Sequence, residues 1–146
     1  MSSATKAATG RRSLVLPFLA GKGGAFFQTL AHFFAEIVTL PPRYLEMVLA
    51  ILRQHLPQAE VWAYGSRVRG DCHDTSDLDL VVRNLADLTQ PLPHLADVAE
   101  AFSESNLPLM VQIIDWARVR REFHDEILAN YVVLRTAEGG QKEGIR

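Results

Sequence analysis

Residues 65–79 read Gly-Ser-Arg-Val-Arg-Gly-Asp-Cys-His-Asp-Thr-Ser-Asp-Leu-Asp, and this stretch decides both the fold and the chemistry that the chain can support. Its two last aspartates, Asp77 and Asp79, are spaced i, i+2. On a strand that spacing puts both side chains on one face, about 7 Å apart along the backbone. Mg²⁺ takes oxygen ligands and is commonly held by one or two carboxylates together with substrate phosphates. The pair therefore predicts a Mg²⁺ site on an extended segment.

Ten residues earlier, Gly65 and Ser66 follow a short apolar run that is typical of a strand. A tight turn at this point exposes backbone N–H groups and a hydroxyl, which together can receive a phosphate tail. A polar hairpin is the alternative, because Gly, Asp and Ser favour turns on their own account. It leaves Asp79 unexplained, since a carboxylate between Leu78 and Leu80 would be costly to bury without a partner.

The chain as a whole sets limits on function. Its 146 residues suffice for one domain, and 48% hydrophobic with 22% charged residues is typical of a globular protein. A formal net charge of −2 argues against duplex nucleic acid as the habitual partner, because such binders carry a Lys/Arg-rich surface. The single Cys72 excludes an internal disulfide and, without paired Cys/His spacings, a structural zinc site. We therefore expect a protein of the reducing cytoplasm.

The hydrophobic pattern alternates helices with short strands. Leu45, Val48, Leu49, Leu52 and Leu56 recur at helical spacing and predict a helix over residues 43–55. We further expect strands at 61–64, 78–82, 109–115 and 131–134, a helix at 95–105 and a last helix through Val119, Phe123 and Ile127. This order predicts an α/β (α+β) domain with a small mixed β-sheet, helices on one face and the other face open.

Composition divides the chain into three segments. Residues 1–37 are expected to form an N-terminal appendage, either disordered, or a weak amphipathic helix over 26–38, or an over-long start. The domain itself is expected at 38–136, followed by a polar tail at 137–146. Glycines and charges interrupt the apolar runs of the first segment, so no stretch of about 18 apolar residues is available to span a membrane.

Three stretches carry a resemblance to a known family. At Tyr64-Gly65-Ser66-Arg67, Ser76-Asp77-Leu78-Asp79-Leu80 and Ile113-Ile114-Asp115-Trp116 the chain resembles the DNA polymerase beta-like nucleotidyltransferase superfamily, above all its stand-alone minimal members. The resemblance covers residues 41–134 and implies the polymerase beta-like fold. It also implies that Asp77 and Asp79 are the catalytic metal ligands for Mg²⁺, and that Gly65, Ser66 and Arg67 bind the nucleotide.

The resemblance implies partners as well. Many minimal nucleotidyltransferases are antitoxins paired with a HEPN-domain toxin, and some transfer AMP from ATP to a tyrosine of that toxin. A nucleoside triphosphate, in the first place ATP, and a HEPN-family toxin are thus the expected partners. Arg67 is favoured over Arg69 for phosphate contact because it directly follows Ser66, whereas Trp62 and Trp116 are expected in the core.

One residue departs from the family pattern. The family carries a third catalytic carboxylate on the neighbouring strand, and the corresponding stretch here places Gln112 at that position. A glutamine has no charge and cannot act as a base. Asp115 lies three residues further on and therefore faces the opposite side of a regular strand, unless a β-bulge turns it.

This departure leaves the function open between classes. The chain is either a transferase of AMP to a partner hydroxyl, weakened by Gln112, or a catalytically degenerate domain that binds a nucleotide or a toxin without turnover. An aminoglycoside-modifying enzyme is a third class, which would need an additional domain to hold the drug.

Overall fold

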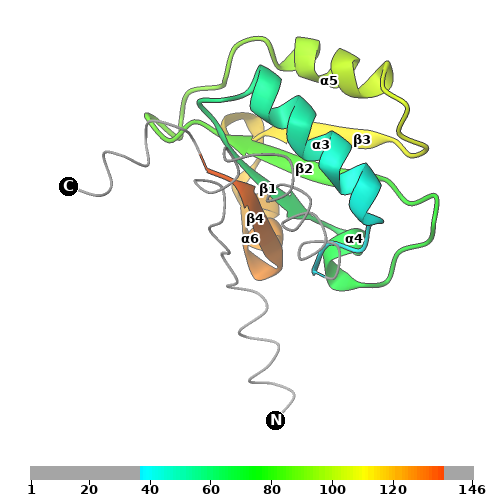
Figure 1. The fold of residues 1–146 in the computed structure, drawn as a ribbon. Helices are drawn as coiled ribbons and strands as arrows, with labels where there is room; N and C mark the ends of the chain where they lie inside the picture. Colours follow the sequence, from blue (N-terminus) through cyan, green and yellow to red (C-terminus); the bar gives the residue numbers. More distant parts are fainter. Residues whose placement is uncertain (1–36, 137–146) are drawn as a thin grey trace.

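The computed structural model of the protein describes residues 37–136 (Figure 1). Apart from Ile37, the expected appendage lies outside the described residues, and so does the expected tail. Val38 is fully buried and Ile37 packs against the same core, so the folded domain already includes these two residues. Within the described range no helix is both long and apolar enough to cross a bilayer.

The secondary structure follows the alternation expected from the sequence. The elements are α3 (Pro42–His55), β1 (Glu60–Tyr64), α4 (Ser66–Arg69), β2 (Leu78–Arg83), α5 (Leu95–Ser103), β3 (Val111–Asp115), the 3-10 helix η2 (Trp116–Arg118), α6 (Arg121–Ala129) and β4 (Tyr131–Arg135). The mixed α/β class is thereby confirmed. The short helix α4 is the main addition, because the sequence predicted only a turn after Gly65.

The four strands form one mixed sheet in the order β3-β2-β1-β4. β1 is antiparallel to both β2 and β4, whereas β2 and β3 run parallel. At one end of the two central strands, Tyr64 of β1 pairs with Asp79 of β2. The chain therefore leaves β1 at Gly65 beside the point where it enters β2, and this puts the predicted site at the end of the central strands rather than at an outer edge.

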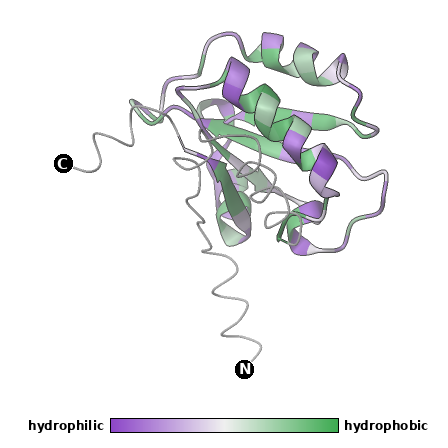
Figure 2. Cartoon of the chain, in the orientation of Figure 1, coloured by the Kyte–Doolittle hydropathy of each residue, from purple (hydrophilic) through white to green (hydrophobic). Residues whose placement is uncertain are grey.

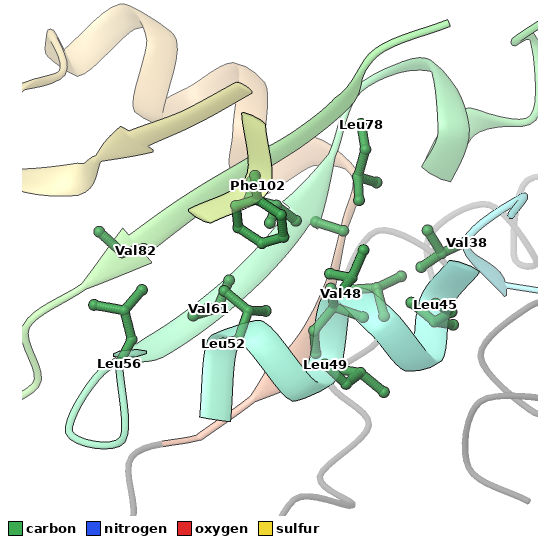
Figure 3. Close-up of a cluster of buried hydrophobic side chains, with 14 of the residues drawn as sticks. Val38, Leu45, Val48, Leu49, Leu52, Leu56, Val61, Leu78, Val82 and Phe102 are labelled. Carbon is green, nitrogen blue, oxygen red and sulfur yellow. The ribbon is translucent and has the colours of Figure 1, made fainter. Parts of the chain in front are cut away.

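Helices α3 and α5 cover one face of the sheet (Figure 1). Pro42 at the start of α3 has a fixed φ that suits the first turn of a helix. The buried face of α3, with Leu45, Val48 and Leu52, meets sheet residues such as Val61 (Figure 3). Each fully buried aliphatic side chain of this kind contributes about 1.5–3 kcal/mol. Much of the sheet is hydrophobic in Figure 2, as expected for a sheet that packs against the apolar faces of helices.

The second face is not open, which corrects the sequence-based expectation. Helix α6 and η2 pack on it through a second buried cluster that consists of Trp62, Val81, Trp116, Ile127 and Val133. Both tryptophans are core residues, as predicted: the Trp62 ring stacks on Tyr131 at 4.0 Å and meets Trp116 edge-on at 5.4 Å. Since Trp62 and Asp79 project from the same face of the sheet, α6 becomes a neighbour of the predicted site.

Candidate active site

Gly65 ends β1 in a conformation that few other residues adopt, with φ at +87°. A Cβ atom built at this position would lie 2.3 Å from Oδ2 of Asp79. The absence of a side chain therefore allows the Asp79 carboxylate to rest directly against the backbone of the turn. This close approach brings the two halves of the sequence motif together.

The residues after Gly65 form the single turn of helix α4. The Gly65 carbonyl accepts hydrogen bonds from the N–H groups of Val68 and Arg69, both at 3.0 Å. Gly70 closes the turn in the left-handed conformation and donates its N–H to the Ser66 carbonyl at 2.8 Å. Ser66 is thus the first residue of a helix, where backbone N–H groups have no acceptor within the helix and suit an anion.

The structure brings Asp77 and Asp79 together. Asp79 lies within β2 between the fully buried Leu78 and Leu80, and Asp77 immediately precedes the strand. Partial burial raises the pKa of the Asp79 carboxyl, the negative charge of Asp77 raises it further, and the nearby Arg69 opposes the shift. The two carboxylates therefore repel each other at short range, and a shared cation would relieve that repulsion.

Gln112 lies beside both carboxylates. It pairs with Asp79 across the parallel β2–β3 ladder, and its Nε2 donates a hydrogen bond to Oδ2 of Asp77 at 3.3 Å. The register shows no irregularity along this ladder, so no bulge turns Asp115 towards the site. Instead the buried Asp115 accepts hydrogen bonds from the N–H groups of Leu92 and Ala117. In residues 37–136 no three His, Cys, Asp or Glu side chains cluster so as to hold a metal.

Arg67 is placed differently from the expected phosphate contact. The residue is 3% exposed, and its guanidinium donates to the backbone carbonyls of Thr39, His73, Asp74 and Ser76. Four of its five N–H groups are therefore engaged with the protein itself. Arg67 therefore holds the loop between α4 and β2 against the start of the domain, and these contacts do not support the phosphate contact expected for it.

Arg69 takes the position that the sequence reasoning gave to Arg67. Its side chain is 51% exposed and forms an ion pair with Asp71 at 3.5 Å. It lies three residues after Ser66, so the two side chains share a face of α4 and both line the same cleft. This helical spacing is the signal that could have identified Arg69, but it becomes visible only once α4 is known to be a helix.

The cleft has a volume of about 590 Å³, within the range of small-molecule sites. Its walls are Tyr64, Gly65, Ser66, Arg69, Asp79, Phe123, Glu126, Ala129 and Asn130. Burial, and to a lesser extent the charge of Asp79, raises the pKa of Tyr64 to about 12, so its hydroxyl stays protonated at neutral pH. The residues from α6 form a wall that the sequence analysis did not assign to the site.

Mutation of Gly65 to alanine is expected to disrupt this arrangement. The new methyl group would collide with the Asp79 carboxylate, and the positive φ adds strain of about 1–3 kcal/mol. We expect Mg²⁺-dependent nucleotide affinity, measured by calorimetry, to fall at least about tenfold, which corresponds to 1.4 kcal/mol. Gly70→Ala is the matched control, because its φ is also positive but nothing lies within 4 Å of the added carbon. Equal loss of affinity in both variants would contradict the close-approach argument.

Comparison with known proteins agrees with this geometry. Residues 46–138 match the family model described as "Polymerase beta, Nucleotidyltransferase". The chain therefore belongs to the polymerase beta-like nucleotidyltransferase family, and the resemblance seen in its sequence is confirmed. Among curated proteins, it is similar to the "Probable protein adenylyltransferase MntA" of Haemophilus influenzae, with 43% identity over 96 residues that cover 64% of this chain and 81% of the relative.

Proposed function

We propose that this protein transfers AMP from ATP to a hydroxyl group of a partner protein, with Mg²⁺ as the metal. The observation that carries the proposal is the contact between the Asp79 carboxylate and the turn at Gly65, at the mouth of a cleft large enough for a nucleotide. Family membership supports nucleotidyl transfer as the reaction class. The name of the Haemophilus relative supports adenylyl transfer to a protein.

Asp77 and Asp79 would hold the Mg²⁺. Two adjacent carboxylates, of which the negative charge of Asp77 helps to raise the pKa of Asp79, suit a hard divalent cation whose remaining ligands come from phosphates. When bound, the metal neutralises charge on the phosphates during transfer. Arg69 and the start of α4 would attract the triphosphate, whereas Gly65 leaves room for the Asp79 carboxylate against the turn. Tyr64, which stays protonated, adds no negative charge to this end of the cleft.

The acceptor would be a separate protein. The name of the Haemophilus relative, a protein adenylyltransferase, supports an acceptor of this kind. A HEPN-family toxin is the partner that the sequence resemblance implies, with the protein as its antitoxin. The demand for ATP and the single unpaired Cys72 favour a cytoplasmic setting.

A second candidate function rests on Gln112. This residue occupies the place of the third carboxylate and donates to Asp77, so it supplies neither charge nor a base. A domain of this kind binds a nucleotide through Asp77, Asp79 and Arg69 but transfers it slowly or not at all. It would then neutralise its toxin by contact alone.

Incubation with α-labelled ATP, Mg²⁺ and a HEPN-family protein as acceptor tests the primary proposal. Label should appear on the partner, and the neutral isosteres Asp77→Asn and Asp79→Asn should reduce the rate at least about 100-fold, in keeping with the loss of charge stabilisation at the reacting phosphate. Co-purification of the two proteins should persist in both variants. Complex formation without labelling by the natural protein would favour the binding module instead.

A further inference from the structure

The α6 wall of the cleft carries polar groups that phosphate and metal binding do not use. Phe123 and Glu126 stand at i and i+3 on one side of α6, and Asn130 follows the helix with an extended backbone. All three line the same cleft as Ser66 and Arg69. Of these, Asn130 follows the last residue of the helix and caps it through its backbone N–H, which donates to the Ile127 carbonyl at 3.1 Å.

The charges in the cleft assign its two sides to different parts of a ligand. Arg69 attracts phosphate, and Asp79 can meet phosphate through a cation. Glu126 is an exposed carboxylate on α6, and the α6 residues that line the cleft include no aspartate to share a metal with it as Asp77 could with Asp79, so its charge would repel a triphosphate. A carboxylate instead accepts hydrogen bonds from neutral donors, such as an exocyclic amine or a sugar hydroxyl. The uncharged half of a nucleotide therefore belongs against α6.

The side chain of Asn130 is poised for such a contact. Its Oδ1 is buried without a hydrogen-bond partner in the described part of the chain. An unpaired buried carbonyl is unfavourable, and rotation of the amide towards the cleft would break no hydrogen bond of this oxygen. An asparagine amide presents one acceptor beside one donor, a pattern that matches the amine and the ring nitrogen on one edge of adenine.

Phe123 supplies an aromatic surface in the same wall. The rings of Phe123 and Tyr64 meet nearly at right angles, at a centroid distance of 5.8 Å and an angle of 84°, and this contact joins α6 to β1. Nucleobases of any sequence stack on such rings, so this contact contributes affinity and little selectivity. Selectivity falls to the hydrogen-bonding groups next to it.

We propose that the α6 wall is the nucleoside subsite of the cleft, where Phe123 contacts the base and Asn130 with Glu126 selects adenine through its exocyclic amine. This inference rests on the proposed nucleotide-binding function and deepens it. Uracil presents a carbonyl oxygen where adenine presents the amine. This oxygen is an acceptor and would face the acceptor oxygens of Asn130 and Glu126. ATP should consequently bind more tightly than UTP.

Calorimetry with ATP, UTP and inorganic tripolyphosphate, each in the presence of Mg²⁺, tests this assignment. The Kd of the natural protein for ATP should be at least about tenfold lower than its Kd for UTP. Asn130→Ala and Glu126→Ala should each remove most of that preference. Asn130→Ala should leave the affinity for tripolyphosphate unchanged, whereas Glu126→Ala, which removes a repelling charge, should not lower it. Asn130→Leu, which is close to asparagine in size and has no hydrogen-bonding group, provides a second variant should the alanine protein melt at a lower temperature, and it should lose the preference as well.

Asp125→Ala is the matched control for Glu126→Ala, because Asp125 is an exposed carboxylate of the same helix that does not line the cleft. It should bind all three ligands as the natural protein does. Equal affinity for ATP and UTP, or an unchanged preference in both α6 variants, would overturn the subsite while nucleotide binding itself stands. Failure of the natural protein to bind even tripolyphosphate would overturn the proposed function together with the subsite.

Discussion

Replacement of Gln112 by aspartate is expected to raise the rate of nucleotide transfer by about 100-fold or more, the usual contribution of a positioned acid–base group. Gln112 pairs with Asp79 and contacts Asp77, so a carboxylate at this position would join the two that are already present. It would add both a negative charge for cation binding and a base near the acceptor hydroxyl. The rate is measured with α-labelled ATP and a HEPN-family protein as acceptor.

The same substitution should lower the folding stability of the protein in the absence of metal. Asp77 already raises the pKa of Asp79, and a third carboxylate adds further repulsion. We expect Gln112→Asp to lower the melting temperature without Mg²⁺ and to regain the loss when Mg²⁺ is added, because a ligand that binds only the folded state stabilises it. Gln112→Asn is the control, since it has the size of aspartate without the charge. Stronger Mg²⁺ stabilisation with no gain in rate would show that the missing carboxylate does not limit turnover.

Replacement of Arg67 by alanine is expected to cost about 3 kcal/mol or more of folding stability, since hydrogen bonds to a charged donor contribute about 1.5–3 kcal/mol each and are not additive. The guanidinium holds carbonyl groups of the loop at 73–76 and of Thr39 together, and the Thr39 N–H in turn donates to the Arg67 carbonyl at 2.8 Å. A loss of this size should lower Tm by more than about 10 °C for a domain of this length.

Two further variants separate stability from ligand binding. Arg67→Lys keeps the charge but cannot reproduce the planar fork, so it should be intermediate in stability. Arg69→Ala removes an exposed side chain, whose ion pair with Asp71 contributes little, and should leave Tm within about 2 °C while it weakens tripolyphosphate binding. A stable Arg67→Ala protein with selectively reduced phosphate affinity would restore the role that the sequence first suggested for Arg67.

The strands and helices were largely predictable because their hydrophobic periodicity reports burial directly. Leu45, Val48, Leu49 and Leu52 indicated α3, and all of them are buried. The opposite orientation of Asp115 followed from the two-residue period of a strand, and the regular β2–β3 register confirms it. The close approach of Asp79 to Gly65 was also predictable, because motif residues that bind one ligand must lie near each other in space.

The roles of the two arginines were not predictable in this way. Arg67 and Arg69 are chemically identical and lie two residues apart, and their difference arises only from the turn of α4, which directs one inwards and the other to the cleft. The α6 wall was missed for a related reason. Glu126 and Asn130 belong to no local motif and reach the site only because Trp62, Trp116 and Ile127 pack α6 onto the second face of the sheet.

The sequence by itself determined the family, the positions of the site residues along the chain and the shared orientation of Asp77 and Asp79. These features depend on residue type and on periodicity over a few positions. Only the tertiary structure decided which arginine lines the cleft, where Asp115 is anchored and which residues of α6 complete the cleft wall. Those features depend on contacts between segments that are distant in the chain, and local periodicity carries no information about which distant surfaces will pack together.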